Sequence, residues 1–236
     1  MVTKERDAHR PRWRRLLGGF WAQLLLAFVV VGLILSFIAK PYVVPSGSML
    51  QTLEPGDRIL VNRLAFLGGS PATGDVVVFD ADDSWETPAA TEVDPARAVL
   101  RWVGEVTGFG PSGPRTLVKR VIGSPGQVVA CCDASGRVLV DGEPIEEPYV
   151  SDDFAFERGV LDCTTTPRSS RCFDRVTVPE DSYLVLGDHR SGSRDSALGC
   201  RSSGQSDGCW RWATQAGIVG EVVAIVWPIP RWTTLG

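Results

Sequence analysis

A long hydrophobic run lies near the N-terminus of the chain, from Leu16 to Ala39. These 24 residues carry no charge, and Gln23 and Ser36 are their only clearly polar members. As a helix, the run would reach about 36 Å at roughly 1.5 Å per residue, enough to cross a hydrocarbon core of about 30 Å. The pattern predicts a transmembrane helix over residues 16–39.

A cleaved signal peptide is the alternative interpretation of this run. The apolar region of such a peptide usually spans about 7–15 residues, and this run is much longer. The sequence Ser36-Phe37-Ile38-Ala39-Lys40-Pro41 also lacks a small-x-small motif before a plausible cut. We therefore expect an anchor that stays attached.

Beyond Lys40-Pro41 the hydrophobic pattern changes to short apolar runs that are separated by Gly, Pro, Asp and Ser. These runs are rich in Val, Ile and Leu, which favours strands, and no long helical periodicity follows the anchor. We expect a mainly β body with loops over residues 80–97 and 151–176 and with turns at 123–126 and 133–136. The strands are predicted at Arg58–Asn62, Asp75–Phe79, Leu117–Ile122, Gln127–Ala130, Arg137–Val140, Ser182–Leu186 and Ile218–Trp227.

Charge is distributed unevenly along the 236 residues, whose net charge is −4. The first twenty residues hold six basic and two acidic side chains, a net of +4, so the remainder carries −8. Basic residues before a span place the N-terminus in the cytoplasm and residues from about 41 onward outside. The acidic body argues against a nucleic-acid partner.

All six cysteines lie beyond the predicted span, at Cys131, Cys132, Cys163, Cys172, Cys200 and Cys209. An even number on the outer side indicates disulfides, and fifteen connectivities are possible. The pairs Cys163–Cys172 and Cys200–Cys209 would each close a short loop, and we favour them. Zinc is the competing interpretation, but the chain has no CxxC pair and His189 is the only histidine on the outer side.

Two segments carry candidate chemistry: Pro45-Ser46-Gly47-Ser48-Met49 and Val118-Lys119-Arg120-Val121-Ile122-Gly123. A lysine in an apolar strand loses charge stabilisation when it is buried, which lowers its pKa. A drop from about 10.4 to roughly 8 costs around 3 kcal/mol and leaves about one lysine in ten neutral at pH 7. A neutral lysine can accept the proton of a serine hydroxyl. We therefore expect Lys119 to be buried and without a carboxylate partner.

A histidine-based triad is the rival mechanism, with His189 as the only base available outside. Its context, Gly187-Asp188-His189-Arg190, is polar and turn-like. We expect His189 to be a surface or supporting residue.

Several blocks in this order resemble the bacterial type I signal peptidases, the Ser/Lys leader peptidases, and in particular their actinobacterial members. The resemblance spans nearly all of residues 16–236. After the anchor, its blocks are Pro45–Met49, Gly56-Asp57, Gly74–Phe79, Lys119–Gly126 and Gly187–Ser196. Each block is weak alone, and their succession is highly specific.

The resemblance implies a role for individual residues. Ser48 would be the nucleophile and Lys119 the general base. The hydroxyl of Ser46 and the backbone N–H of Ser48 would form the oxyanion hole, and Ser193 would hydrogen-bond and orient the lysine. The structural residues near the site would be Asp188, Asp195 and Arg120.

The family also implies an organisation and partners. Residues 1–15 would be a cytoplasmic tail and 16–39 the anchor. Residues 40–236 would form an extracytoplasmic antiparallel β-sheet catalytic body with an inserted β subdomain at roughly 128–180. The enzyme would cut preproteins after a small-x-small motif, at the surface of the cell membrane and in contact with lipid. It would need no cofactor and no metal; the sequence leaves the oligomeric state open, with a monomer expected.

The chain departs from the family pattern at three positions. Gln51 stands where proline is frequent, and His189 stands where asparagine is common. Ala197 replaces an arginine that usually follows the Asp-Ser pair, so Asp195 would need Arg194 or Arg201 as its ion-pair partner.

Two other functions remain alternatives. A self-cleaving Ser/Lys protease of the repressor type would share the dyad, but the anchor and the outer cysteines count against a cytosolic regulator. A membrane-tethered, non-catalytic β binding module would lack a working site, and the intact Ser48, Lys119, Ser46 and Ser193 argue against that loss.

Overall fold

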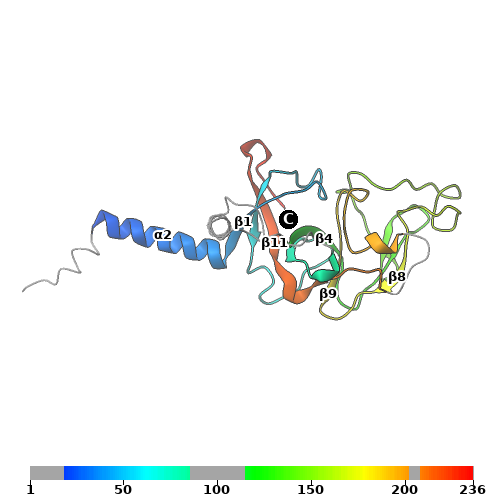
Figure 1. Cartoon of the computed structure of the whole chain (residues 1–236), viewed down its shortest axis with the longest axis horizontal. Coiled ribbons are helices and arrows are strands. Elements are labelled where there is room, and N and C mark those ends of the chain that lie inside the picture. Colours follow the sequence, from blue (N-terminus) through cyan, green and yellow to red (C-terminus); the bar gives the residue numbers. More distant parts are fainter. Residues whose placement is uncertain (1–18, 86–114, 202–207, 236) are drawn as a thin grey trace, which may run out of the picture.

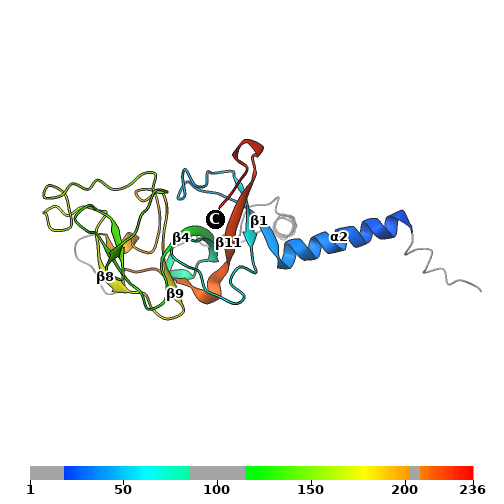
Figure 2. The same cartoon turned by 180° about the vertical axis from the view of Figure 1, so that it is seen from behind.

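The computed structural model describes residues 19–85, 115–201 and 208–235 of the chain. The predicted cytoplasmic tail 1–15, the first residues of the predicted anchor, and residues 86–97 of the predicted loop 80–97 lie outside the described residues. The described part begins with one α-helix and continues as two antiparallel sheets (Figures 1 and 2).

Helix α2 (Phe20–Phe37) projects from the body at the end opposite the smaller sheet (Figure 1). Most of its sequence is Leu, Val, Phe and Ala, and side chains such as Trp21, Leu25 and Phe28 are more than 60% exposed. Within the described residues, no helix combines the length and the apolar character that spanning a membrane requires.

The larger sheet has eight strands in the order β1-β2-β11-β3-β4-β9-β10, with β12 paired to β11. All of its pairs are antiparallel, and strand β11 lies between β2 and β3, with bulges against both. The strands are β1 (Ala39–Val43), β2 (Arg58–Asn62), β3 (Val76–Asp80), β4 (Thr116–Gly123), β9 (Ser182–Leu186), β10 (Ala213–Thr214), β11 (Ile218–Trp227) and β12 (Thr233–Thr234).

The smaller sheet has four antiparallel strands in the order β7-β6-β5-β8. It is inserted in the sequence between β4 and β9 of the larger sheet. Its strands are β5 (Val128–Cys131), β6 (Val138–Val140), β7 (Glu143–Pro144) and β8 (Phe173–Thr177). Short 3-10 helices complete the described structure: η1 (Asp83–Trp85), η2 (Leu198–Cys200), η3 (Gln215–Gly217) and η4 (Ile229–Arg231).

The seven predicted strands are all present, three of them with identical bounds (β2, β9 and β11). The prediction of a loop over 151–176 is wrong at its end, because Phe173–Thr177 forms β8. The chain also leaves the helix earlier than the hydrophobic pattern indicated. Ala39 already belongs to β1, because Ala39–Val43 pairs with β2 and this pairing satisfies its backbone groups.

The core consists of three apolar clusters. Two pack on the larger sheet, around Leu53 and Ile59 and around Phe79 and Trp85. The third lies between the sheets: Leu184 and Leu186 of β9 meet Val129, Val138 and Phe173 of the smaller sheet. This shared cluster fixes the smaller sheet against the strands that carry the site.

Three disulfides join the cysteines. Cys163 pairs with Cys172 and Cys200 with Cys209, which are the two local pairs expected from the sequence. The third pair joins the adjacent residues Cys131 and Cys132 at the end of β5. All three lie in or beside the smaller sheet and its loops.

Candidate active site

Ser48 lies in a tight turn directly after β1. Two backbone hydrogen bonds tie the two ends of this segment together, from Val44 N–H to the Asp57 carbonyl and from Gly56 N–H to the Val44 carbonyl. Met49 and Leu53 are buried in the core beneath the turn. Since the apolar neighbours point inward, Ser48 is left partly exposed at the rim.

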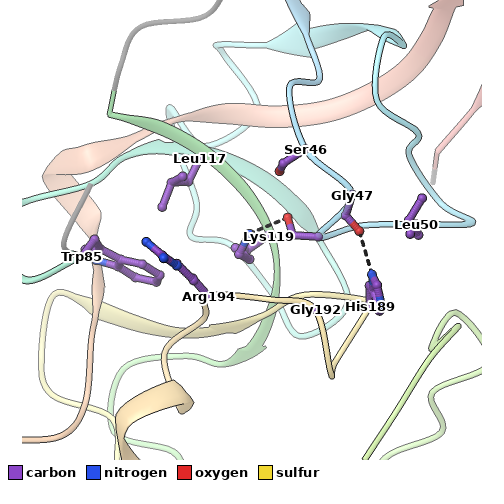
Figure 3. A pocket seen from close by; sticks show the side chains of 10 residues that line it. Ser46, Gly47, Leu50, Trp85, Leu117, Lys119, His189, Gly192 and Arg194 are labelled. Atoms are coloured by element: carbon purple, nitrogen blue, oxygen red, sulfur yellow. Dashed lines mark hydrogen bonds between the residues drawn. The ribbon is translucent and has the colours of Figure 1, made fainter. Parts of the chain in front are cut away.

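Lys119 comes from the middle of strand β4, opposite Val77 of β3. It is 3% exposed. Its Nζ lies 2.7 Å from Ser48 Oγ, within hydrogen-bonding distance, and it donates a second hydrogen bond to the Val118 carbonyl at 3.1 Å. The two segments singled out in the sequence therefore meet at these two side chains, as Figure 3 shows.

Burial lowers the pKa of Lys119 from 10.5 to about 8, against the opposing negative charges of Asp195 and Asp188. Among the described residues no carboxylate lies close enough to Lys119 to form an ion pair. The prediction of a buried lysine without a carboxylate partner is confirmed. At neutral pH an appreciable fraction of this amine is uncharged and can accept a proton.

Ser193 does not make the hydrogen bond that the family resemblance implied. Its hydroxyl is buried but has no hydrogen-bond partner. Ser193 instead packs against Gly187, where a Cβ would lie 2.2 Å from Ser193 Oγ and 2.5 Å from the Ser48 carbonyl oxygen. The absence of a side chain at Gly187 lets these two segments approach each other. The second hydrogen bond of Lys119 goes to the Val118 carbonyl of its own strand, and the expected hydrogen bond between Ser193 and Lys119 is not formed.

A pocket of about 420 Å³ opens over the Ser48–Lys119 pair (Figure 3). Ser46 lines it and is exposed, so its hydroxyl is accessible from the pocket. The walls are largely apolar. The lining residues are Ser46, Gly47, Ser48, Leu50, Trp85, Leu117, Lys119, His189, Gly192 and Arg194.

A buried ion pair, Arg120–Asp188, lies next to the site. Arg120, which follows Lys119 on β4, makes two hydrogen bonds to the carboxylate of Asp188, at 2.9 and 2.7 Å. Asp188 also accepts a hydrogen bond from Thr52 Oγ1 at 2.6 Å. Arg120 further donates to the Gly74 carbonyl and lies 3.8 Å from the centroid of the Tyr149 ring. These contacts link the turn after Ser48 to β4 and to the loop after β9.

Asp195 is completely buried and pairs with Arg201 at 3.6 Å. It also accepts hydrogen bonds from the backbone N–H groups of Ala197 and Gly187. Arg201 therefore takes the place of the arginine that Ala197 replaces, one of the two substitutes expected from the sequence. Arg194, the other, lines the pocket instead.

His189 does not face the Ser48 hydroxyl. Its Nδ1 lies 3.1 Å from the Gly47 carbonyl oxygen and its Nε2 lies 3.1 Å from Asp152 Oδ2. Both ring nitrogens are occupied, so neither serves as a base for Ser48. The geometry rules out the rival triad and agrees with the expected supporting role.

Gln51 has a positive φ of 72°. Proline, frequent at this position in the family, is fixed near −65° and cannot adopt this conformation. The turn after Ser48 in this chain therefore requires a residue other than proline at position 51.

The described residues contain one group of side chains with the proximity of metal ligands, Cys132, Cys163 and Cys172. All three are in disulfides, so none offers the thiolate that metals bind.

A buried lysine hydrogen-bonded to a serine beside an open pocket has the geometry of the Ser–Lys class of serine proteases. The comparisons with known proteins give the family of the chain. The family "Signal peptidase, peptidase S26" matches residues 17–227, and the chain belongs to this family.

Relatives match most of the chain. Signal peptidase I of Mycobacterium tuberculosis is 35% identical over 96% of this chain and 78% of its own length. Signal peptidase I of Leptolyngbya laminosa is 32% identical over 85% of this chain and 75% of its own. A signal peptidase I crystal structure from Enterococcus faecalis is 22% identical, with a TM-score of 0.35 over 65% of this chain and 97% of that one.

Several site residues were not found by the sequence reasoning. Leu117 was detectable, because residues two apart on a strand share a face and Leu117 precedes Lys119 by two. Thr52, Tyr149, Asp152 and Trp85 give no local signal, because each reaches the site only through contacts between distant segments.

Proposed function

We propose that this protein is a signal peptidase I, a membrane-bound serine endopeptidase that removes signal peptides from exported preproteins by means of a Ser48/Lys119 dyad. The observation that carries the mechanism is the 2.7 Å contact between Ser48 Oγ and the buried Nζ of Lys119. The family and its named relatives support the substrate class.

In the proposed reaction, Ser48 Oγ attacks the scissile carbonyl while its proton passes to the neutral Nζ of Lys119. The resulting oxyanion accepts hydrogen bonds from the Ser48 backbone N–H and the Ser46 hydroxyl. Lys119 then protonates the leaving amine as the C–N bond breaks, which leaves an ester on Ser48. Water attacks this ester while Lys119 takes its proton. The bond between the acyl carbon and Ser48 Oγ then breaks, Lys119 returns the proton to Ser48, and the signal peptide leaves as a carboxylic acid that ionises in water.

The pocket is consistent with a signal peptide whose last residues before the cut are small. Its apolar lining, with Leu50, Leu117 and Trp85, offers shallow contacts on either side of the dyad. We propose that small side chains at the first and third positions before the cut occupy this surface.

We also propose that residues 16–39 anchor the protein in the cell membrane, with residues 1–15 in the cytoplasm and 40–236 outside. The support is the uncharged run in the sequence and the exposed apolar side chains along α2. Exposed apolar residues on the body, among them Leu67, Trp227, Ile229 and Trp232, would contact lipid. Vesicle flotation of a chain lacking residues 1–40 tests this contact, and no association with lipid would contradict it.

The decisive experiment is cleavage of a peptide whose signal ends in Ala-x-Ala by the full chain and by two variants. Ser48→Ala removes the nucleophile and Lys119→Ala removes the base, so each should lower kcat by more than about a thousandfold. Thermal unfolding of Ser48→Ala should match the parent. Undiminished turnover in Lys119→Ala would refute the dyad. If the parent itself is inactive, the non-catalytic binding module becomes the better interpretation.

The same peptide gives a pH test of the base. Because only the neutral lysine accepts a proton and its pKa is about 8, kcat/KM should rise about tenfold between pH 7 and a plateau above pH 9. A profile that is flat across this range would contradict Lys119 as the base.

A further inference from the structure

His189 contacts two backbone carbonyl groups: that of Gly47, just before the Ser48 nitrogen, and that of Ser48 itself. Its ring Nδ1 meets the Gly47 carbonyl oxygen at 3.1 Å, and its backbone N–H donates to the Ser48 carbonyl at 3.1 Å. The first contact is drawn in Figure 3, on the side of the nucleophile turn away from Trp85 and Arg194. One residue thus fixes the backbone on both sides of the nucleophile.

The Gly47 carbonyl belongs to the same peptide unit as the Ser48 N–H. This peptide is not among the cis bonds of the described chain, and a trans peptide is planar, with its C=O and N–H pointing in opposite directions. Whatever fixes the Gly47 carbonyl therefore fixes the direction of the Ser48 N–H. Glycine at position 47 leaves this unit more free to rotate than any other residue would, so an external restraint has an effect here.

Each nitrogen of the imidazole faces a hydrogen-bond acceptor. A carbonyl oxygen only accepts, so Nδ1 must carry a proton to bond Gly47. Nε2 faces Asp152 Oδ2, which also accepts from Ser191 Oγ at 2.8 Å. Hydrogen bonds from Ser191 and His189 lower the pKa of Asp152, which keeps it an ionised acceptor. Only the imidazolium donates from both nitrogens at once.

The other charged groups near His189 have partners of their own. Asp188 pairs with Arg120, and Arg190 pairs with Glu147 and donates to the Gly187 carbonyl. Lys119 bonds Ser48 Oγ. Gly192 lies against the imidazole, where a Cβ would come within 2.5 Å of the ring. Asp152 is therefore the carboxylate that faces the ring.

We propose that His189, held by Asp152, is a positioning residue that orients the Gly47–Ser48 peptide so that the Ser48 N–H faces the oxyanion. This inference rests on the proposed function. Loss of the imidazole removes the contact with the Gly47 carbonyl, releases the peptide and weakens the oxyanion hole. The effect falls on the transition state and leaves substrate binding unchanged, because the oxyanion exists only during the reaction.

The test measures kcat and KM of the full chain on the Ala-x-Ala peptide between pH 6 and 10. His189→Leu removes the donor, and kcat should fall about ten- to a hundredfold with KM unchanged within about threefold, since a missing oxyanion donor costs 10²–10³. His189→Asn supplies an uncharged N–H for the Gly47 carbonyl and should restore kcat to within about threefold of the parent. Asp174→Asn, an exposed carboxylate on β8, is the matched control for Asp152→Asn.

Asp152→Asn weakens the contact that holds the ring, so it should lower kcat toward the value of His189→Leu, while Asp174→Asn should leave kcat unchanged. Equal kcat in His189→Leu and the parent, or equal kcat in Asp152→Asn and Asp174→Asn, would overturn the inference. If His189→Leu does not fold, the comparison of Asp152→Asn with Asp174→Asn decides alone. Turnover that survives Ser48→Ala would instead sink the proposed function itself.

Discussion

One ion pair beside each sheet differs in burial. In the larger sheet, Lys119 and the Arg120–Asp188 pair are buried, with 12% of the arginine side chain and none of the aspartate exposed. Beside the smaller sheet, the Arg168–Asp174 pair is more exposed, at 26% and 64%, although the Arg190–Glu147 pair is buried. Three disulfides lie in or beside this smaller sheet.

The difference follows from the size of each core. Two of the apolar clusters belong to the larger sheet, and they supply enough burial to hold charges that are unfavourable where they sit. The smaller sheet shares its one cluster with β9 and gains further stability from covalent links. The amine of Lys119 is therefore buried on the sheet with the larger core.

The largest expected effect comes from breaking the buried pair. Arg120→Ala leaves Asp188 charged and buried, and it should lower the free energy of unfolding by about 3–5 kcal/mol. Denaturant unfolding measures this change. Arg168→Ala breaks the exposed pair of the smaller sheet and should change the same quantity by less than about 1 kcal/mol. Equal losses in both variants would erase the contrast between the sheets.

Removing the buried amine should have the opposite sign. Burial lowers the pKa of Lys119 to about 8, so below that pH the folded protein holds an unfavourable charge. Lys119→Met should therefore raise the free energy of unfolding by up to about 3 kcal/mol at pH 7 while it abolishes turnover. A lower free energy of unfolding for Lys119→Met than for the parent at pH 7 would show that Lys119 is held by favourable contacts.

The pH dependence of this gain has a definite sign. Between about pH 8 and 10.5 the unfolded chain binds more protons at Lys119 than the folded one does. Stability of the parent should then rise with pH across this window, and the advantage of Lys119→Met should vanish above it. Unfolding curves at pH 7, 9 and 11 measure this convergence.

The smallest expected effect on stability comes from removing a disulfide. Replacing Cys163 and Cys172 by serine opens a loop with a sequence separation of 9, which should cost roughly 2–3 kcal/mol. Because the dyad stands on the larger sheet, kcat on the Ala-x-Ala peptide should stay within about threefold of the parent. Thiol titration of the unfolded parent checks that no cysteine is free. A fall in kcat of more than about tenfold would show that the two sheets act as one unit.

Much of the site was available in the sequence because its residues lie in short contiguous blocks. Ser46 and Ser48 share one turn, and Lys119 and Arg120 share one strand, so local pattern and family resemblance located them together. Short runs rich in Val, Ile and Leu, bounded by turn residues, likewise predicted β2, β9 and β11 with their observed bounds. The acidic body, the anchor-like run and the local cysteine pairs also needed nothing beyond residue order.

Tertiary structure alone decided what depends on contacts between distant segments. Pairing between Ala39–Val43 and β2 ended the helical run early, and pairing with β5 turned Phe173–Thr177 into a strand. Ser193 packs on Gly187 and makes no hydrogen bond to Lys119, and Arg201 reaches Asp195. Whether a polar group finds its partner depends on the direction of a side chain in space, and residue order carries no record of that direction until the sheets have packed.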